Sequence, residues 1–189
     1  MYRQVLKLLI ILFAIGVLFV SLAQAAQSDS VTVTVTVTPS ISVEIQETDL
    51  SLGSVAAGGI LLSATAVTVR NTGSGIKETY SLSLTDPVDP TTGAKTWEAV
   101  QDEAARIAEK YILNAAFDSD GAGTIWGETN HALSIIPTPC TDTKFAGDQT
   151  GVGVAYNGVR KLWFQFKAPT ATTVSTEQSI AVTITAQAS

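Results

Sequence analysis

Apolar residues recur at every second position in short runs along most of the chain, and Gly, Pro, Asn and Asp separate these runs. A period of two is typical of strands with one buried face, and the separating residues favour turns. The pattern predicts an all-β fold, an antiparallel β-sandwich with one short helix and a long loop region. The predicted strands cover residues 31–38, 41–46, 50–53, 64–71, 79–85, 111–117, 162–167 and 179–186.

The predicted strands 64–71 and 79–85 flank the sequence Asn-Thr-Gly-Ser-Gly, which begins at Asn71. Asn and Gly tolerate the positive φ angles of hairpin turns, so these two strands are predicted to form an antiparallel pair. The alternative is that the two strands belong to opposite sheets.

Two regions depart from the period of two. Residues 98–109 are rich in Ala and Glu and have apolar residues near helical spacing, which predicts a short helix between two strands. Residues 118–159 are rich in Gly, Asp, Thr and Pro, which favours a functional loop or weak edge strands. The sequence His-Ala-Leu-Ser-Ile-Ile, residues 131–136, is one candidate for such a strand.

The most regular alternation is the fourfold Val-Thr repeat of residues 31–38, which Pro39 ends. Both residue types are β-branched and favour strands, and eight residues in a strand reach about 27 Å. A strand with a free leading end can complete a sheet of its own domain or a sheet of a neighbouring subunit. We interpret the segment as a donor strand, whose interface residues would be Val31, Val33, Val35 and Val37.

Residues 1–25 have the organisation of a secretory signal peptide. Arg3 and Lys7 precede an apolar run from Leu8 to Val20, and the sequence Ala-Gln-Ala ends the segment at Ala25. The run is shorter than the roughly 20 residues that cross a bilayer, and the small residues suit a signal peptidase. An uncleaved membrane anchor is the alternative.

Cleavage after Ala25 would leave 164 residues (189 minus 25), enough for one domain. The expected organisation is a signal peptide (1–25), a donor-type strand (26–38) and a β-sandwich domain (39–189). We expect the mature protein to be secreted, to lie outside the cell at its surface, and to have no contact with the membrane after signal cleavage.

The chain is acidic. Its net charge of −6 becomes −8 without residues 1–25, because nine basic residues then face seventeen acidic ones. This balance argues against nucleic acid as a partner. Cys140 is the only cysteine, which excludes an intramolecular disulfide; we expect a buried thiol, with an intermolecular link as the alternative.

The sequence contains no recognisable catalytic group of residues, and we predict that the protein is not an enzyme. His131 is the only histidine, and no Gly-x-Ser-x-Gly motif is present. A dyad of His131 with Cys140 would need an activated thiol, which nothing in the sequence indicates. Paired carboxylates of the glycosidase type would be brought together only by folding.

Metal and cofactor sites are not predicted either. Zinc sites need several Cys or His ligands, and calcium sites need a set of oxygen ligands. The acidic pairs Asp118 with Asp120 and Asp142 with Asp148 are the best calcium candidates, but the rest of an EF-hand loop is missing. We expect these residues to form solvated turns.

Residues 50–84 contain the sequences LSLGSVAAGG, TAVTVRNTGSG and TYSLSL. This pattern resembles secreted immunoglobulin-like β-sandwich proteins of the CARDB kind and the filament-forming TasA and camelysin proteins. The resemblance implies an immunoglobulin-like sandwich that assembles by inserting an amino-terminal strand into a neighbouring copy. Residues 31–38 match that donor strand by position.

The expected function is therefore a structural subunit of an extracellular filament, pilus or surface layer, whose partners are copies of the same chain. The alternative is a secreted carbohydrate- or ligand-binding module with a cell-surface glycan as its partner. Trp126 or Trp163 would then stack on sugar rings, while packing in the core is the competing interpretation for these residues and for Trp97.

Overall fold

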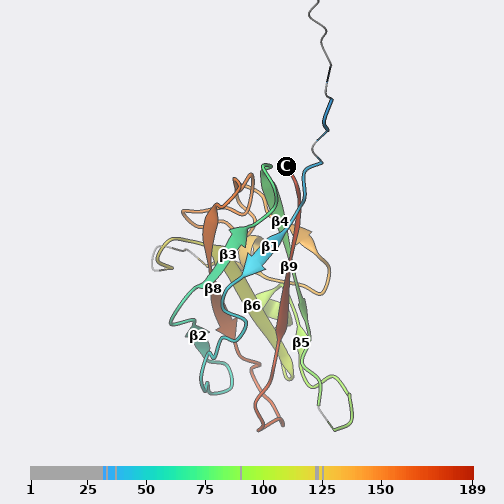
Figure 1. The fold of residues 1–189 in the computed structure, drawn as a ribbon. Helices are drawn as coiled ribbons and strands as arrows, with labels where there is room; N and C mark the ends of the chain where they lie inside the picture. Colours follow the sequence, from blue (N-terminus) through green and yellow to red (C-terminus); the bar gives the residue numbers. More distant parts are fainter. Residues whose placement is uncertain (1–31, 33, 37, 90, 122–123, 125) are drawn as a thin grey trace, which may run out of the picture. The chain divides into compact units, whose positions relative to one another are not determined.

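The computed structural model describes residues 32, 34–36, 38–89, 91–121, 124 and 126–189 (Figure 1). The chain divides into two compact units, residues 1–37 and residues 38–189. The second unit is the all-β domain, and the first contains the predicted signal peptide and nearly all of the predicted donor strand. Among the described residues, no helix is long and apolar enough to cross a membrane.

Two sheets form the domain. The larger sheet has six strands, and β8 (Val159–Lys167) lies at its centre between β3 (Val67–Asn71) and β6 (Lys110–Phe117). Its edges are β1 (Val43–Ile45) and β5 (Glu98–Ala99), and β2 (Ile60–Leu62) pairs with β8 beyond the end of β3. The smaller sheet has three strands in the order β7 (Thr138–Pro139), β4 (Glu78–Thr85) and β9 (Ala181–Ala188). Strand pairing is antiparallel except between β5 and β6.

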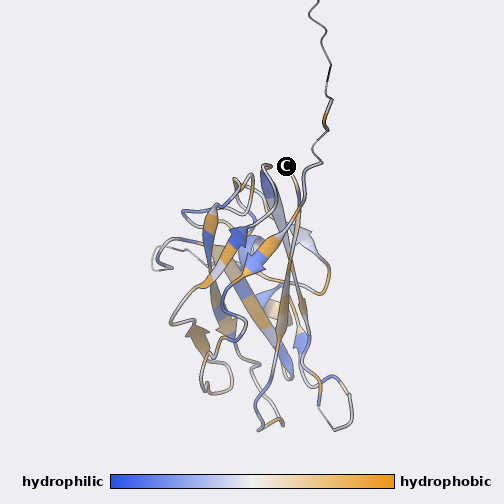
Figure 2. Ribbon diagram, in the orientation of Figure 1, coloured by the Kyte–Doolittle hydropathy of each residue, from blue (hydrophilic) through white to orange (hydrophobic). Residues whose placement is uncertain are grey.

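The core lies between the two sheets, and alternating side chains of the strands fill it. In β8 the side chains of Leu162, Phe164 and Phe166 are buried in the core cluster. In β4 the fully buried residues Tyr80 and Leu82 face them from the smaller sheet. Figure 2 shows hydrophobic residues along the strands of both sheets. The predicted all-β sandwich is thus confirmed, and the period of two arises from burial of one strand face.

The predicted pairing of the strands around residues 64–71 and 79–85 is wrong. Strand β3 pairs with β1 and β8, whereas β4 pairs with β7 and β9, so the connection crosses from one sheet to the other. The side chain of Asn71 holds this crossing in place: its Nδ2 donates to the carbonyl oxygens of Ile76 (3.0 Å) and Val154 (2.8 Å). Its Oδ1 accepts a hydrogen bond from the amide of Gly73 (2.9 Å).

The predicted helix over residues 98–109 is also wrong. Glu98 and Ala99 form β5, and only the 3-10 helix η2 (Glu103–Ala105) is helical in this range. Asp102 caps η2 by accepting a hydrogen bond from the amide of Ala104, and the backbone leaves helical geometry at Arg106. Pairing of β5 with the start of β6 outweighs the helix propensity of this Ala- and Glu-rich segment.

Three smaller predictions also need correction. Residues 50–53 form no strand, although Leu50 and Leu52 pack against the core. Strand β2 was not predicted, because it has only three residues. In the sequence HALSII, His131 ends the four-residue helix α2 (Glu128–His131), and the nearby strand is β7. The rest of the long loop region is irregular where the structure describes it, as predicted.

Replacement of Asn71 by Ala removes three hydrogen bonds at the crossing between the sheets and leaves buried backbone groups without partners. We expect Asn71→Ala to lower the free energy of unfolding by about 2 to 4 kcal/mol. Urea denaturation of the purified protein measures the effect. The control is Ser74→Ala in the same connection, whose side chain is exposed and bonds to Ser40; its effect should stay within about 1 kcal/mol. Equal effects of the two changes would contradict the role assigned to Asn71.

Candidate functional site

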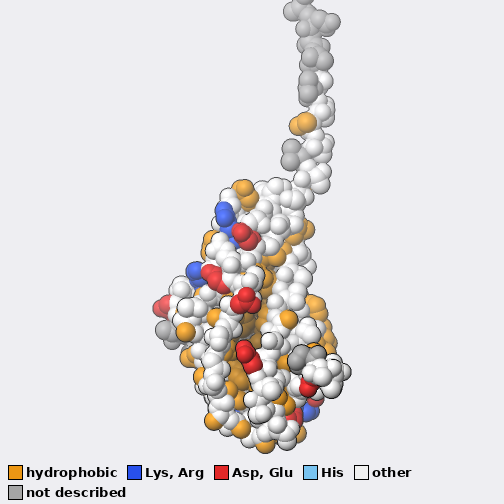
Figure 3. Space-filling view, turned by 60° about the horizontal axis from the view of Figure 1, so that its bottom comes forward, with side chains coloured by type: hydrophobic (Ala, Val, Ile, Leu, Met, Phe, Trp, Pro, Cys, Tyr) orange, Lys and Arg blue, Asp and Glu red, His pale blue; other side chains and the backbone are white. Residues whose placement is uncertain are grey.

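An apolar groove runs between the two sheets along β9. It has a volume of about 900 Å³ and is lined by β9, by the inner face of the larger sheet, and by the segments 45–57 and 168–178. Figure 3 shows hydrophobic side chains gathered in the hollow of this face. The groove exists because the three-stranded sheet is narrower than the six-stranded sheet that it covers.

Residues of opposite sheets form the walls of the groove. Phe164 and Phe166 point into it from β8, and Val182 and Ile184 point into it from β9. Trp97 lies at one end, where its ring packs against Phe166 at a centroid distance of 6.0 Å. The groove therefore offers an extended apolar surface to an occupant.

The charged side chains that line the groove are those of Glu47 and Glu177, both exposed. Glu47 accepts a hydrogen bond from the Thr68 amide, and this bond lowers the pKa of its carboxyl group. Among the described residues, no Lys, Arg or His lines the groove. Beside the apolar walls from β8 and β9, Ser, Thr and Gln residues of the segments 45–57 and 168–178 contribute to the lining, so its chemistry suits an uncharged occupant and does not suit an anion.

Within the part of the chain that the structure describes, strand β9 is an edge strand, because it pairs with β4 on one side only. Its eight residues, Ala-Val-Thr-Ile-Thr-Ala-Gln-Ala, include no charged residue and no Pro. Charged residues, Pro and bulges are the features that normally protect an edge strand from pairing with another chain. The long unprotected edge of β9 and the apolar groove beside it form the candidate functional site.

The predicted donor residues lie in the first unit of the chain. Val31, Val33 and Val37 lie outside the described residues. Val35 is described: it belongs to no strand, and 81 % of its surface is exposed. Its role in a subunit interface remains a prediction.

His131 and Cys140 have separate environments. The Nδ1 of His131 lies 3.1 Å from both the amide nitrogen and the carbonyl oxygen of Gly127, and its Nε2 lies 3.1 Å from the carbonyl oxygen of Ala146. Both ring nitrogens thus face backbone groups, and His131 is buried. Cys140 is buried as well, and burial raises the pKa of its thiol to about 12. A thiol with so high a pKa is a poor nucleophile.

Asp118 and Asp148, one from each predicted calcium pair, hold loops in place through hydrogen bonds. Asp118 is buried and accepts hydrogen bonds from the amides of Asp120 and Gly121 and from the hydroxyl of Thr124. Burial alone would raise the pKa of Asp118, but these hydrogen bonds together hold it below its usual value. Asp148 accepts hydrogen bonds from Ser119. In the described part of the chain, no three His, Cys, Asp or Glu residues are grouped as metal ligands.

The three tryptophans have different surroundings. Trp97 packs on Tyr111 and Phe166 at the end of the groove, and its Nε1 donates to Thr172. The Nε1 of Trp163 donates to the carbonyl oxygen of Asp118, and the ring of Trp126 packs edge-on against His131. Trp97 therefore belongs to the groove, which the sequence analysis did not foresee.

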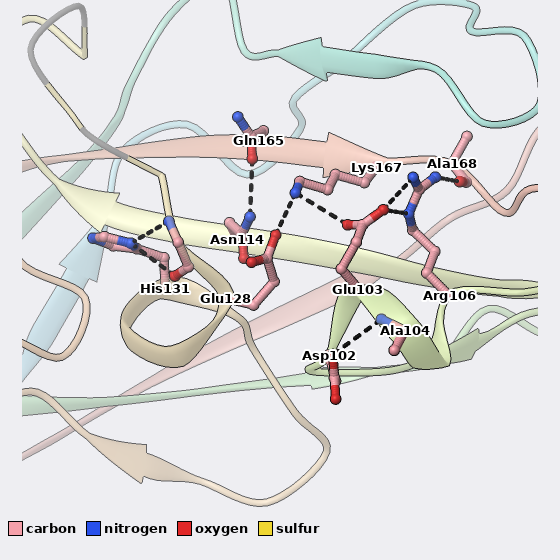
Figure 4. Close-up of polar contacts among 11 residues, drawn as sticks. Asp102, Glu103, Ala104, Arg106, Asn114, Glu128, His131, Gln165, Lys167 and Ala168 are labelled. Atoms are coloured by element: carbon pink, nitrogen blue, oxygen red, sulfur yellow. Dashed lines mark hydrogen bonds and ion pairs between the residues drawn. The ribbon is translucent and has the colours of Figure 1, made fainter.

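A polar cluster, which the sequence analysis also missed, covers the outer face of the larger sheet (Figure 4). Lys167 of β8 forms ion pairs with Glu103 of η2 and Glu128 of α2, and Arg106 pairs with the same Glu103. In addition, Asn114 donates a hydrogen bond to Gln165 at 2.9 Å. Polar residues alternate with core residues along β8, and this alternation could have predicted polar contacts on the outer face of the sheet.

The cluster holds the irregular segments on the sheet. The hydrogen bond from Arg106 lowers the pKa of Glu103, and that from Lys167 lowers the pKa of Glu128. Burial works to lower the pKa of Lys167, but its hydrogen bonds to Glu128 and Glu103 raise it overall. We interpret the cluster as structural.

No family model matches the chain, and the search of curated proteins finds no relative. The resemblance to the CARDB, TasA and camelysin proteins therefore remains a prediction.

Replacement of Lys167 by Ala leaves Glu103 and Glu128 close together without their shared cation. We expect the free energy of unfolding to fall by about 1 to 3 kcal/mol at pH 7. The control is Lys110→Ala, which removes a more exposed ion pair with Glu98 (3.5 Å) and should change stability by less than about 1 kcal/mol. Chemical denaturation measures both, and a larger loss for the Lys110 variant would contradict the role of the cluster.

The lowered pKa values of Glu103 and Glu128 predict a pH dependence. Because the folded protein holds these carboxyl groups ionised below their usual pKa of 4.5, the unfolded chain binds more protons in acid. The stability they contribute is fully present above pH 4.5 and disappears as the pH falls through their folded values. We expect denaturation midpoints of the unmodified protein to fall more steeply below pH 4.5 than those of Lys167→Ala. Parallel pH profiles of the two proteins would exclude this contribution.

Proposed function

We propose that this protein is a structural subunit of an extracellular filament, pilus or surface layer. It polymerises by donating its amino-terminal strand, residues 26–38, to a neighbouring copy. The observation that carries the proposal is the apolar groove beside the unpaired edge of β9. A strand placed there would cover core side chains and provide backbone partners to β9 at the same time.

The donor segment and the groove have matching chemistry. The Val-Thr repeat is uncharged over residues 31–38 and carries valine at every second position, and the walls that β8 and β9 contribute to the groove are apolar. Burial of 150 to 250 Å² of methyl surface would contribute roughly 4 to 6 kcal/mol at about 25 cal/mol per Å², before backbone hydrogen bonds and ordering costs. This amount suffices for a contact that every subunit repeats.

Export forms part of the proposal. Residues 1–25 would direct the chain out of the cell and would be removed, which places the donor segment at the beginning of the mature protein. The resemblance to filament-forming secreted proteins points to the same cellular location, at the outer surface.

A ligand-binding module is the second candidate function, because Trp97 lines one end of the groove. A sugar ring could stack on this indole. Binding of soluble glycans that persists after removal of residues 26–38, in a protein that forms no polymers, would favour this candidate.

Removal of residues 26–38 tests the structural proposal. We expect the shortened protein to remain folded, because the described domain begins at Thr38 and its core contains none of the earlier residues that the structure describes. It should be a monomer in analytical ultracentrifugation and should show no fibres or lattices in negative-stain electron microscopy, whereas the full mature chain assembles. Assembly that continues unchanged after the deletion would overturn the proposal.

Paired charge substitutions separate the two faces of the donor segment. Val33→Asp with Val35→Asp places carboxylates on the face that would enter the groove, and we expect at least a tenfold loss of assembly. Thr34→Asp with Thr36→Asp adds the same charge to the opposite face and should reduce assembly much less. Sedimentation of polymer measures both variants; equal losses would show that net charge, rather than burial of valine, controls association.

A further inference from the structure

We infer that the amino-terminal segment of a second copy pairs with β9 in antiparallel orientation, so that the subunits join head to tail in an open chain. This inference rests on the proposed function and adds to it the acceptor strand, the direction and the register of the contact. It follows from the backbone of β9, from the place where the donor segment leaves the domain, and from the residues that line the groove.

The backbone of β9 presents free groups toward the groove. In β4, the amides of Tyr80 and Leu84 donate to Gly151 and Ser134, which lie away from β9. The even-numbered residues of β4 therefore face away from β9, and the odd-numbered ones bond to it. Since β4 pairs Leu84 with Val182 and Leu82 with Ile184, the amide and carbonyl groups of these two β9 residues point to the open edge.

Among the described residues, no hydrogen bond is found for these backbone groups of Val182 and Ile184. The same two residues direct their side chains into the groove. An added strand with valine at alternate positions can therefore bond to the edge and fill the groove with the same residues. Its threonines would then lie opposite the outward-facing residues of β9.

The place where the donor segment leaves the domain and the groove lie toward opposite ends of β9. Residues 38–42 are bound beside the connection from β3 to β4: Ser40 and Ser74 exchange hydrogen bonds, and Ser42 accepts from the amide of Thr72. The C-terminal Ser189 binds Lys77 at this same end, just beyond β9 (Figure 1). The groove, in contrast, runs along the start of β9 and the segment 168–178 that precedes it.

A chain that leaves the domain at the end of β9 reaches the groove of a second copy most directly when the copies are stacked. Residue 38 would then lie near the open end of the neighbour's groove and residue 31 deeper inside it. The donor segment would run against the direction of β9, which gives an antiparallel pair. Pairing within one chain would instead require a reversal at Pro39 and would run parallel to β9.

The groove also sets the register. Its inward-facing residues along this edge are Val182 and Ile184 of β9 and Ile180, which lies just before β9, so it accepts three alternate side chains of a donor. We place Val37, Val35 and Val33 opposite these three residues, in that order. Thr36 then faces Ala181, and Thr32 faces Thr185. These are pairs without mutual hydrogen bonds, at a Cα separation of about 4.5 Å that suits a disulfide.

The donor surface and the acceptor surface are different parts of the domain, so one contact leaves a free donor and a free acceptor. Such a heterologous contact does not close on itself after two subunits and continues as a chain. The structure thus favours a polar filament over a two-fold dimer.

Cysteine cross-linking between singly substituted proteins tests the inference. Thr36→Cys mixed with Ala181→Cys, and Thr32→Cys mixed with Thr185→Cys, should each form disulfide-linked dimers after assembly and mild oxidation. The exchanged mixtures, Thr36→Cys with Thr185→Cys and Thr32→Cys with Ala181→Cys, should give at least tenfold less. The buried native Cys140 can stay in place, because its thiol ionises only at high pH. All four substituted positions are exposed and lie outside the core, so the substitutions should preserve the fold.

The possible results separate a failure of this inference from a failure of the proposed function. Polymers that form while the exchanged mixtures give the stronger cross-links would overturn the antiparallel direction and leave strand donation standing. Polymers without cross-links in any of the four mixtures would overturn β9 as the acceptor. Monomers under all conditions, seen by ultracentrifugation, would overturn the proposed function and this inference together.

Discussion

The unequal widths of the two sheets are the constraint on which the candidate site depends. Three strands face six, so the inner face of the larger sheet extends beyond the edge of β9. The aromatic and aliphatic side chains of β8 face this open region as well as the closed core. Since apolar surface is stabilised when it leaves water, the groove offers a driving force for association.

The lengths and sequences of the edge strands explain why an added strand would bind at the groove beside β9. The other edges of the two sheets are short: β1 has three residues, and β5 and β7 have two each. Strand β7 also contains Pro139, and β5 contains Glu98. Strand β9 alone among these edges combines eight residues with an uncharged sequence and a neighbouring groove. These features are the opposite of the usual protection of edge strands against pairing.

The outer face of the larger sheet is covered by polar contacts, in contrast to the groove on its inner face. There the irregular segments between β5 and β8 lie on the sheet through polar contacts, which include the ion pairs of Lys167 and the hydrogen bonds around Asp118. Of the residues considered for catalytic or metal chemistry, Asp118, His131 and Cys140 are buried, and Asp148 accepts a hydrogen bond from the Ser119 amide. Polar groups in this region thus hold loops in place, while the apolar groove is free for an occupant.

The amino-acid sequence by itself determined the fold class and most of the long strands, because alternation of apolar and polar residues in β4, β8 and β9 follows directly from burial of one strand face. It also marked residues 31–38 as an uncharged strand-forming segment. Only the tertiary structure decided that β3 and β4 belong to opposite sheets, since a turn rich in Gly and Asn serves a hairpin or a crossing equally well. It also decided that residues 98–109 form a short strand and one helical turn, because pairing with β6 outweighs local propensity. The groove has no sequence signature, because it results from the number of strands in each sheet and from which edge of β9 lacks a partner.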